Sequence, residues 1–257
     1  GISLERQNQY NHYKDGLRSA EMKARQVLNR KRQELAGRTF AEYPGKTKKS
    51  LIVLCRNLLD SQKKNWPQLR TACRDLLSTQ TRRLSNECEI YLQYNPARAI
   101  SGGAAVDSES IKSRPCFLCQ DNLPREQQGI LYRDQYLILC NPAPIFEKHF
   151  TIAALKHEPQ EIASSIASLL CLAADASPKY AVFYNGPACG ASAPDHLHFQ
   201  IVPVDALPFF KELKGLVLFH ETASVRYLTS SYCSRPVFVL ESKNVDALAE
   251  QFAHFMN

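Results

Sequence analysis

The 257-residue sequence has no apolar run of the eighteen or more residues that a membrane-spanning helix needs. It also lacks a signal-peptide pattern, an internal repeat and a low-complexity tract. No nucleic-acid-binding motif occurs, and the basic residues are not interleaved with aromatic ones. These absences argue against a membrane protein and a repeat protein, and they make nucleic acid an unexpected partner.

Closely spaced cysteines are also scarce. The chain has nine cysteines, but only Cys116 and Cys119 lie near each other in the sequence. An odd and scattered set is typical of reduced thiols in a cytosolic protein, not of a disulfide framework. We therefore expect a cytoplasmic protein in which most cysteines pack as small apolar side chains.

Acidic residues are scarce in the first third of the chain. Residues 1–86 contain 19 lysines and arginines against 7 acidic residues, whereas the remainder contains 13 against 18. We favour solvated helical surfaces as the explanation; a surface that attracts phosphate-bearing ligands or nucleic acid is the alternative. The change in charge balance after residue 86 predicts a basic helical region over residues 1–86 and a second domain over residues 87–257. A continuation beyond the C-terminal end is left open.

Hydrophobic periodicity predicts helices over residues 8–36, 50–62 and 67–84, and strands after them. Residues 101–114 are expected to form a Gly/Ser-rich loop. The later elements are predicted strands at Glu89–Tyr94, Leu131–Cys140, His149–Leu155, Tyr180–Tyr184, His196–Val204 and Pro236–Leu240, and helices at 158–174 and 245–255. This order predicts an α+β domain with a mainly antiparallel sheet and a crossover helix, preceded by an N-terminal helical segment.

The strongest site signal is the strand that contains His196, His198 and Gln200. Alternate side chains of a strand share a face, so these three point one way while Leu197 and Phe199 point into the core. A half-buried sheet with a polar face produces the same alternation. Two histidines and a glutamine in succession nevertheless favour a functional face.

The loop before this strand strengthens the signal. Gly186 and Gly190 permit close backbone approach, and Ser192 adds a hydroxyl group. Backbone N–H groups and small side chains next to a histidine strand are suited to holding a phosphate. The loop and strand together predict a phosphate-binding active site.

Two segments of the chain resemble strands of the histidine-triad (HIT-like) superfamily. They are His149-Phe-Thr-Ile-Ala-Ala-Leu-Lys-His157 and Gly190-Ala-Ser-Ala-Pro-Asp-His-Leu-His-Phe-Gln200. The resemblance is closer to the transferase branch, which includes galactose-1-phosphate uridylyltransferase, diadenosine tetraphosphate phosphorylase and plant GDP-L-galactose phosphorylase. The segments Tyr94–Arg98, Cys116–Cys119 and Asn141–Phe146 also look like an uncharacterised Bacteroides-type family of this superfamily.

The resemblance implies covalent nucleotidyl transfer. His198 would attack the α-phosphate of a nucleotide, and a second phosphate-bearing substrate would resolve the nucleotidyl-histidine. Hydrolases of the superfamily have a third histidine where this chain has Gln200, and an amide delivers no proton. Gly190, Ser192 and Gln200 would stabilise the transition state. The loop from Ser192 to His196 is one residue longer than the family pattern, which leaves open which hydroxyl contacts phosphate.

Cys116-x2-Cys119 has the spacing of a zinc hairpin, although two cysteines alone are weak evidence. The resemblance implies that His157 and His196 complete a structural zinc site, with His149 as the competing ligand. The zinc would position His198 through the adjacent His196.

Further residues are candidates for binding the nucleotide. Arginine and lysine suit phosphate contacts, and asparagine suits ribose or phosphate. The candidates are Arg98, Lys112, Arg114, Asn95, Asn185 and Gly186, with His149 lining the cleft.

We expect a nucleotidyltransferase or phosphorylase that acts on a nucleoside diphosphate-sugar or a dinucleoside polyphosphate. Its partners would be that nucleotide and a phosphate-bearing acceptor, and a homodimer is left open. A non-catalytic nucleotide-binding module and a HIT-type hydrolase are the alternatives.

Overall fold

The computed structural model describes residues 22–23, 26–27, 29–30, 32–45, 47, 49–85, 90–96, 107–230 and 236–256. The chain forms two compact units, Gly1–Thr39 and Phe40–Asn257. In the first unit, the described residues from Met22 to Glu34 are helical, and a turn begins at Leu35. The remainder of the helix predicted over residues 8–36 lies outside the described residues.

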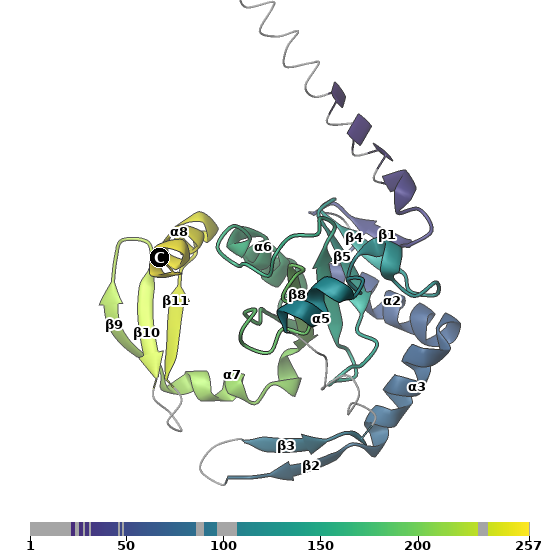
Figure 1. Ribbon diagram of the computed structural model, residues 1–257. Helices are drawn as coiled ribbons and strands as arrows, with labels where there is room; N and C mark the ends of the chain where they lie inside the picture. Colours follow the sequence, from purple (N-terminus) through teal and green to yellow (C-terminus); the bar gives the residue numbers. More distant parts are fainter. Residues whose placement is uncertain are drawn as a thin grey trace, which may run out of the picture. The chain divides into compact units, whose positions relative to one another are not determined.

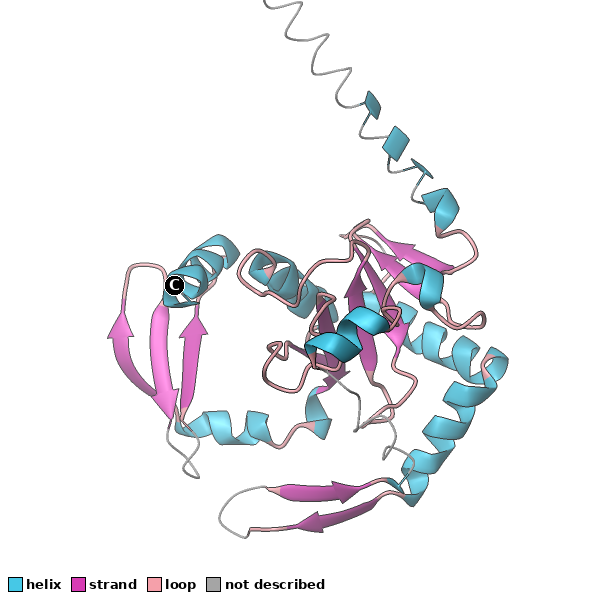
Figure 2. Ribbon diagram, viewed as in Figure 1, coloured by secondary structure: helices cyan, strands magenta, loops and turns pink. Residues whose placement is uncertain are grey.

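A six-stranded sheet forms the centre of the second unit (Figure 1). Its strands are β1 (Thr39–Tyr43), β4 (Gly129–Tyr132), β5 (Tyr136–Cys140), β6 (Phe150–Ala154), β7 (Tyr180–Phe183) and β8 (His198–Pro203). Their spatial order is β1-β4-β5-β6-β8-β7, and every neighbouring pair from β4 to β7 is antiparallel. Since β8 lies between β6 and β7 and is antiparallel to both, β6 and β7 are parallel. Helix α6 (Ile166–Ala176) crosses between them, so the predicted α+β fold with a crossover helix is confirmed (Figure 2).

Helices α2 (Leu51–Asn65) and α3 (Pro67–Asp75) cover one side of this sheet's core. Ser50 caps α2 by accepting a hydrogen bond from the Ile52 N–H. The buried residues of α2 include Leu51, Leu54, Cys55 and Leu58, the spacing of a helix that packs one face inward. The predicted break at Trp66-Pro67 is confirmed.

The second predicted helix, over 67–84, is too long. It ends at Asp75, and η1 (Leu76–Ser78) follows. Residues Gln80–Arg83 form β2 instead, which pairs antiparallel with β3 (Tyr91–Tyr94). The strand predicted over Glu89–Tyr94 is therefore present in its described part.

The single strand predicted over Leu131–Cys140 is wrong. It is a hairpin of β4 and β5, with Arg133 and Asp134 in the turn at φ 50° and 56°. Two successive positive φ angles define the tight turn that matches strand twist. The apolar residues on both sides conceal this turn in the sequence because it contains no glycine.

Other boundaries also differ from the prediction. The strand predicted over His196–Val204 is β8, which begins at His198, so His196 lies in the bend before the strand. The crossover helix begins at Ile166 and not at residue 158, because residues 158–165 form an extended and looped segment. Part of the loop predicted over 101–114 is helix α5 (Ser108–Ser113), which Asp107 caps through the Ser110 N–H. Residues 101–106 lie outside the described residues.

A second, three-stranded sheet follows the first. It has the antiparallel order β11-β10-β9 and includes two strands that the sequence analysis missed. β9 is exposed along its whole length and has the sequence Val-Leu-Phe-His-Glu. It therefore lacks the alternation of apolar and polar residues that predicts a half-buried strand. Helix α8 contacts α6, and Phe252 packs against the main core. The elements are α7 (Phe209–Glu212), β9 (Val217–Glu221), β10 (Arg226–Ser230), β11 (Val237–Glu241), α8 (Val245–Met256) and the short helices η3 (Gln120–Asn122), η4 (Val204–Ala206) and η5 (Leu213–Gly215).

Within the part of the chain that the structure describes, every helix is too short or too polar to cross a bilayer. The predicted domain boundary between residues 86 and 87 lies outside the described residues and stays a prediction.

Candidate active site and metal centre

A cavity of about 520 Å³ lies on the sheet face opposite to the face that α2 covers. Four directly opposed residues on β5, β6, β8 and β7 line it: Leu139, Thr151, Gln200 and Phe183. Its volume falls in the range of sites for small molecules.

The wall of the cavity combines apolar and polar side chains, and histidine is its one ionisable type besides Cys140 among the described lining residues. The described lining residues include no Lys, Arg, Asp or Glu. The lining residues besides the four named above are Gln68, Phe117, Leu118, Asn122, Leu123, Pro124, Gln127, Cys140, Asn141, Pro142, Ala143, Ile145, His149, Asn185, Gly190, Ser192, Ala193 and His198. Apolar side chains with a few amides suit a flat, neutral, hydrogen-bonding group such as a nucleobase.

His198 is the first residue of β8 and lines the cavity. Its Nδ1 lies 2.9 Å from the backbone oxygen of His196. A carbonyl only accepts hydrogen bonds, so Nδ1 carries the proton and Nε2 has a free lone pair. Burial lowers the pKa of His198, which favours this neutral form.

A chain of hydrogen bonds orients Gln200. The Ile145 N–H donates to His149 Nδ1 at 3.2 Å, so the proton of this imidazole is on Nε2. His149 Nε2 then donates to Gln200 Oε1 at 2.7 Å. With its oxygen engaged, Gln200 has its amide N–H groups available to an acceptor, and both Gln200 and His198 line the cavity.

Most of the predicted phosphate loop borders the same cavity. Asn185, Gly190 and Ser192 line it, whereas Gly186 is not among the lining residues. Gly190 has φ of +89°, a conformation that L side chains rarely adopt, and open space surrounds its Cα. A glycine is therefore required there by backbone conformation and not by crowding.

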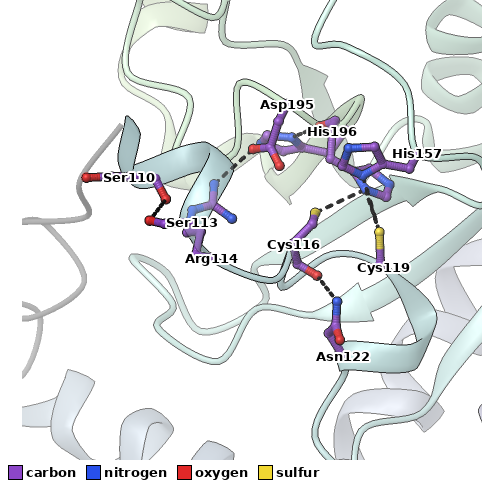
Figure 3. A network of polar contacts seen from close by, with 10 residues as sticks. Ser110, Ser113, Arg114, Cys116, Cys119, Asn122, His157, Asp195 and His196 are labelled. Atoms are coloured by element: carbon purple, nitrogen blue, oxygen red, sulfur yellow. Dashed lines mark hydrogen bonds and ion pairs between the residues drawn. The ribbon is translucent and has the colours of Figure 1, made fainter. Parts of the chain in front are cut away.

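The basic candidates lie elsewhere. Lys112 is exposed on α5. Arg114 Nη2 pairs with Asp195 Oδ1 at 2.9 Å (Figure 3). The Arg114 guanidinium also lies over the Phe117 ring. Neither residue lines the cavity, nor does Asn95. Arg98 lies outside the described residues.

Four predicted metal ligands converge beside this site (Figure 3). Ligand atoms of Cys116, Cys119, His157 and His196 all lie within 4.8 Å of one another, so the four residues are close enough to bind a metal ion. His196 Nδ1 lies 3.3 Å from Cys116 Sγ and 3.6 Å from Cys119 Sγ. His157 Nδ1 lies 3.3 Å from Cys119 Sγ. His149, the competing ligand, hydrogen-bonds Gln200 instead.

The geometry and the protonation of this cluster fit a tetrahedral cation. Zinc–sulfur and zinc–nitrogen bond lengths give a sulfur–nitrogen edge of about 3.6 Å in a tetrahedron. His196 Nε2 donates to the Ala154 oxygen at 2.7 Å, which directs the lone pair of Nδ1 toward the sulfurs. Burial and then the neighbouring Cys116 raise the pKa of Cys119, so a bound cation is what would ionise this thiol.

Sequence reasoning missed one residue of this region. Gln160 is fully buried and hydrogen-bonds the backbone of His198. No sequence signal identifies it, because a single polar residue inside a stretch predicted as helix suggests a solvent-facing position.

Comparisons with known proteins describe the chain's relatives. No curated protein matches it. Crystal structures of yeast Ap4A phosphorylase Apa2 are similar to it: the complex with Ap4A has 17% identity and TM-score 0.45, over 78% of this chain and 72% of that one. The complex with AMP has 18% identity and TM-score 0.42, over 77% and 70%. A family described as a domain of unknown function (DUF4922) matches residues 58–203, more than half of the sequence, and the chain belongs to this family.

Proposed function

We propose that this chain is a nucleotidyltransferase or phosphorylase that forms a covalent nucleotidyl-histidine at His198. The donor would be a nucleoside diphosphate-sugar or a dinucleoside polyphosphate, and phosphate or a sugar phosphate would resolve the intermediate. The observation that carries the proposal is the orientation of the His198 ring. Its Nδ1 is held by the His196 carbonyl, so the nucleophilic Nε2 is the nitrogen left for the cavity.

The reaction balances as two displacements at phosphorus. In the first, Nε2 attacks the α-phosphorus; the P–N bond forms, and the P–O bond to the leaving phosphate breaks with its electron pair on oxygen. The Nδ1 proton stays in its hydrogen bond to His196, whose carbonyl oxygen faces the positive charge on the ring. In the second, an oxygen of the acceptor phosphate attacks phosphorus and the P–N bond breaks. Neutral His198 is then restored.

Gln200 favours transfer over hydrolysis. Its amide groups stabilise charge on the phosphoryl oxygens by hydrogen bonding but deliver no proton. A phosphate leaving group needs none, because it departs as a stable anion. His149 fixes the amide so that its donors, and not its oxygen, are available to the substrate.

The composition of the cavity wall supports a site for the base and ribose of the donor. His198, Gln200 and Ser192 line the cavity together with apolar side chains such as Phe117 and Leu123, and no Lys, Arg, Asp or Glu is among the described lining residues. Polar groups of this kind suit a phosphate, and apolar side chains suit a neutral ring.

We further propose that Cys116, Cys119, His157 and His196 hold zinc. Two thiolates and two imidazoles are a preferred ligand set of this ion. All four positions would be taken by protein ligands, so the ion would cross-link residues 116–119 to the segment after β6 and the segment before β8 without contacting substrate. Its effect on catalysis would pass through the backbone of His196, which holds the His198 ring.

Covalent labelling tests the proposal. The protein is incubated with α-³²P-labelled UDP-, ADP- and GDP-sugars and with labelled dinucleoside polyphosphates, then denatured and separated from free nucleotide. We expect one donor to leave a label that is stable in base and lost in acid, as a phosphoramidate is. Phosphate or a sugar phosphate should release that label as a nucleotide.

The same experiment separates the alternatives. A hydrolase would lose the label to water as fast as to phosphate. A non-catalytic binding module would be stabilised against heat by a nucleotide without becoming labelled. Failure of every donor to label wild-type protein contradicts the proposed mechanism.

A further inference from the structure

The side-chain amide of Gln160 joins the backbone of β8 to the backbone just after β7. Gln160 lies in the segment between β6 and α6, and its side chain is 0% exposed. A buried primary amide is costly unless its donors and its acceptor are satisfied. The partners of this amide are all backbone atoms.

Three hydrogen bonds join the amide to its surroundings. Gln160 Oε1 accepts from the His198 N–H at 2.7 Å. Its Nε2 donates to the His198 oxygen at 3.0 Å and to the Asn185 oxygen at 2.9 Å. The Gln160 backbone is also anchored, since its N–H donates to the Pro194 oxygen and its oxygen accepts from the Tyr184 hydroxyl at 2.6 Å.

The sheet register explains this arrangement. β7 pairs with β8 as far as Phe183 opposite Gln200. Continuing the register by two residues would place Asn185 opposite His198. Instead β7 ends at Phe183, and the Gln160 amide bonds to both Asn185 and His198. A side-chain amide has the same donor and acceptor as a peptide group, so it replaces the missing strand partner of His198.

We propose that Gln160 is a positioning residue that fixes the backbone of His198 where β7 has left the sheet. The inference rests on the proposed role of His198 as nucleophile. On the other side of β8, Ala153 pairs with His198 through the register of β6. Gln160 forms the hydrogen bonds on the opposite edge of His198, where β7 would otherwise continue. The loop after Phe183 can therefore leave the sheet and border the cavity while the backbone of His198 stays in place.

The chemistry of the amide is specific. A carboxylate at this position would accept from the His198 N–H but would face two backbone oxygens with no proton to donate. An apolar side chain of similar size would leave the N–H and both oxygens without these partners. Glutamine alone among the common side chains of this length offers the acceptor and the two donors together.

The test compares two buried glutamines. Gln62 is also 0% exposed; its Nε2 donates to the Glu126 oxygen at 3.1 Å and its Oε1 accepts from the Gln128 N–H at 3.0 Å. Gln160→Met and Gln62→Met therefore remove comparable buried hydrogen bonds, but only the first removes bonds to His198. Both variants are labelled with the donor nucleotide across a range of concentrations, at a temperature where circular dichroism shows each to be folded.

We expect Gln160→Met to lower the labelling rate constant at saturating nucleotide by about 100-fold, the effect of a displacement of about 1 Å at a reacting atom. The nucleotide concentration for half-maximal rate should change less than the rate constant, because Gln160 itself does not line the cavity. Hydrogen exchange at the His198 amide should accelerate in Gln160→Met and stay at the wild-type rate in Gln62→Met.

Several outcomes would overturn the inference: a wild-type labelling rate in Gln160→Met, unchanged exchange at the His198 amide, or an equal loss of rate in Gln62→Met. If Gln160→Met does not fold, Tyr184→Phe replaces it, because this variant removes only the hydroxyl that anchors the Gln160 backbone. It should slow labelling and accelerate His198 exchange in the same direction, and wild-type values for both would overturn the inference. If wild-type protein is never labelled, the proposed function fails, while exchange at His198 still decides whether Gln160 holds this backbone.

Discussion

His196 and His198 are two residues apart in the sequence, yet their rings make hydrogen bonds through opposite nitrogens. Each imidazole has one nitrogen that donates to a backbone carbonyl. In His196 it is Nε2, bonded to Ala154, so Nδ1 faces the sulfurs of Cys116 and Cys119. In His198 it is Nδ1, bonded to His196 itself, so Nε2 is left for the cavity.

The comparison shows that the position of a backbone carbonyl, and not the sequence motif, determines which nitrogen of each histidine has a free lone pair. A carbonyl protonates the nitrogen it contacts and thereby frees the other one. The two sites are also coupled, because the oxygen that orients His198 belongs to His196. Under the proposed function, a change at the four predicted metal ligands should therefore affect His198, whereas loss of the His198 ring should leave those ligands in place.

The largest expected effect is that of His198→Ala. Removing the proposed nucleophile should lower nucleotide labelling by about 10⁴-fold or more. Metal content, measured by elemental analysis, should stay equal to that of wild-type protein because His198 contributes no ligand. Labelling that survives in His198→Ala, or metal that is lost from it, would abolish the proposed division between the two histidines.

Gln200→Leu should have the next largest effect. It removes the amide donors next to His198 at similar side-chain volume, and loss of one such donor lowers rates by about 10²- to 10³-fold. Single-turnover labelling at saturating nucleotide measures this rate, and metal content serves as the control. A variant with weaker nucleotide binding but a normal rate constant would assign Gln200 to binding alone.

Metal removal should have a smaller effect on rate and a clear one on stability. Cys119→Ser or chelation should lower labelling by about 10- to 100-fold, the usual effect of altering a supporting contact. The melting temperature should fall, because metal binding contributes to folding. If carefully prepared protein contains far less than one zinc per chain, the zinc assignment is wrong.

The smallest effect on labelling should come from Tyr132→Phe. This variant tests whether a loss of stability away from His196 and His198 leaves both histidines unaffected. The Tyr132 hydroxyl donates to Asp175 Oδ2 at 2.7 Å, and Arg133 pairs with the same carboxylate. Losing this hydrogen bond should lower the free energy of unfolding by about 1 kcal/mol in urea denaturation. Labelling and metal content should not change. A matching loss of labelling would mean that both histidines respond to general destabilisation.

The sequence predicted the elements in which the spacing of apolar residues along the chain matches the side chains that are buried in the fold. Leu197 and Phe199 alternate with His196 and His198, and both apolar residues are in the core as expected. The turn at Arg133-Asp134 was concealed because these residues adopt positive φ without the glycine that usually indicates it.

Long-range partners were beyond sequence reasoning. Arg114 has the chemistry of a phosphate-binding residue, but its proximity to Asp195 depends on where the end of α5 and the loop before β8 lie in space. Gln160 bonds His198 across 38 positions of sequence, and no periodicity encodes such a contact. By contrast, the four metal ligands converge as expected, because the family resemblance already contained that tertiary information.

The divergence of β7 from β8 after Phe183 also bears on how this family can vary. Residues 184–197 lie outside the β7–β8 ladder, so inserting or deleting a residue there need not shift the pairing of Gln200 with Phe183 and Thr151. An additional residue between Ser192 and His196 would be accommodated in this way. A change of loop length could therefore alter the cavity wall, which includes Asn185, Gly190 and Ser192, while the register of β8 stays constant.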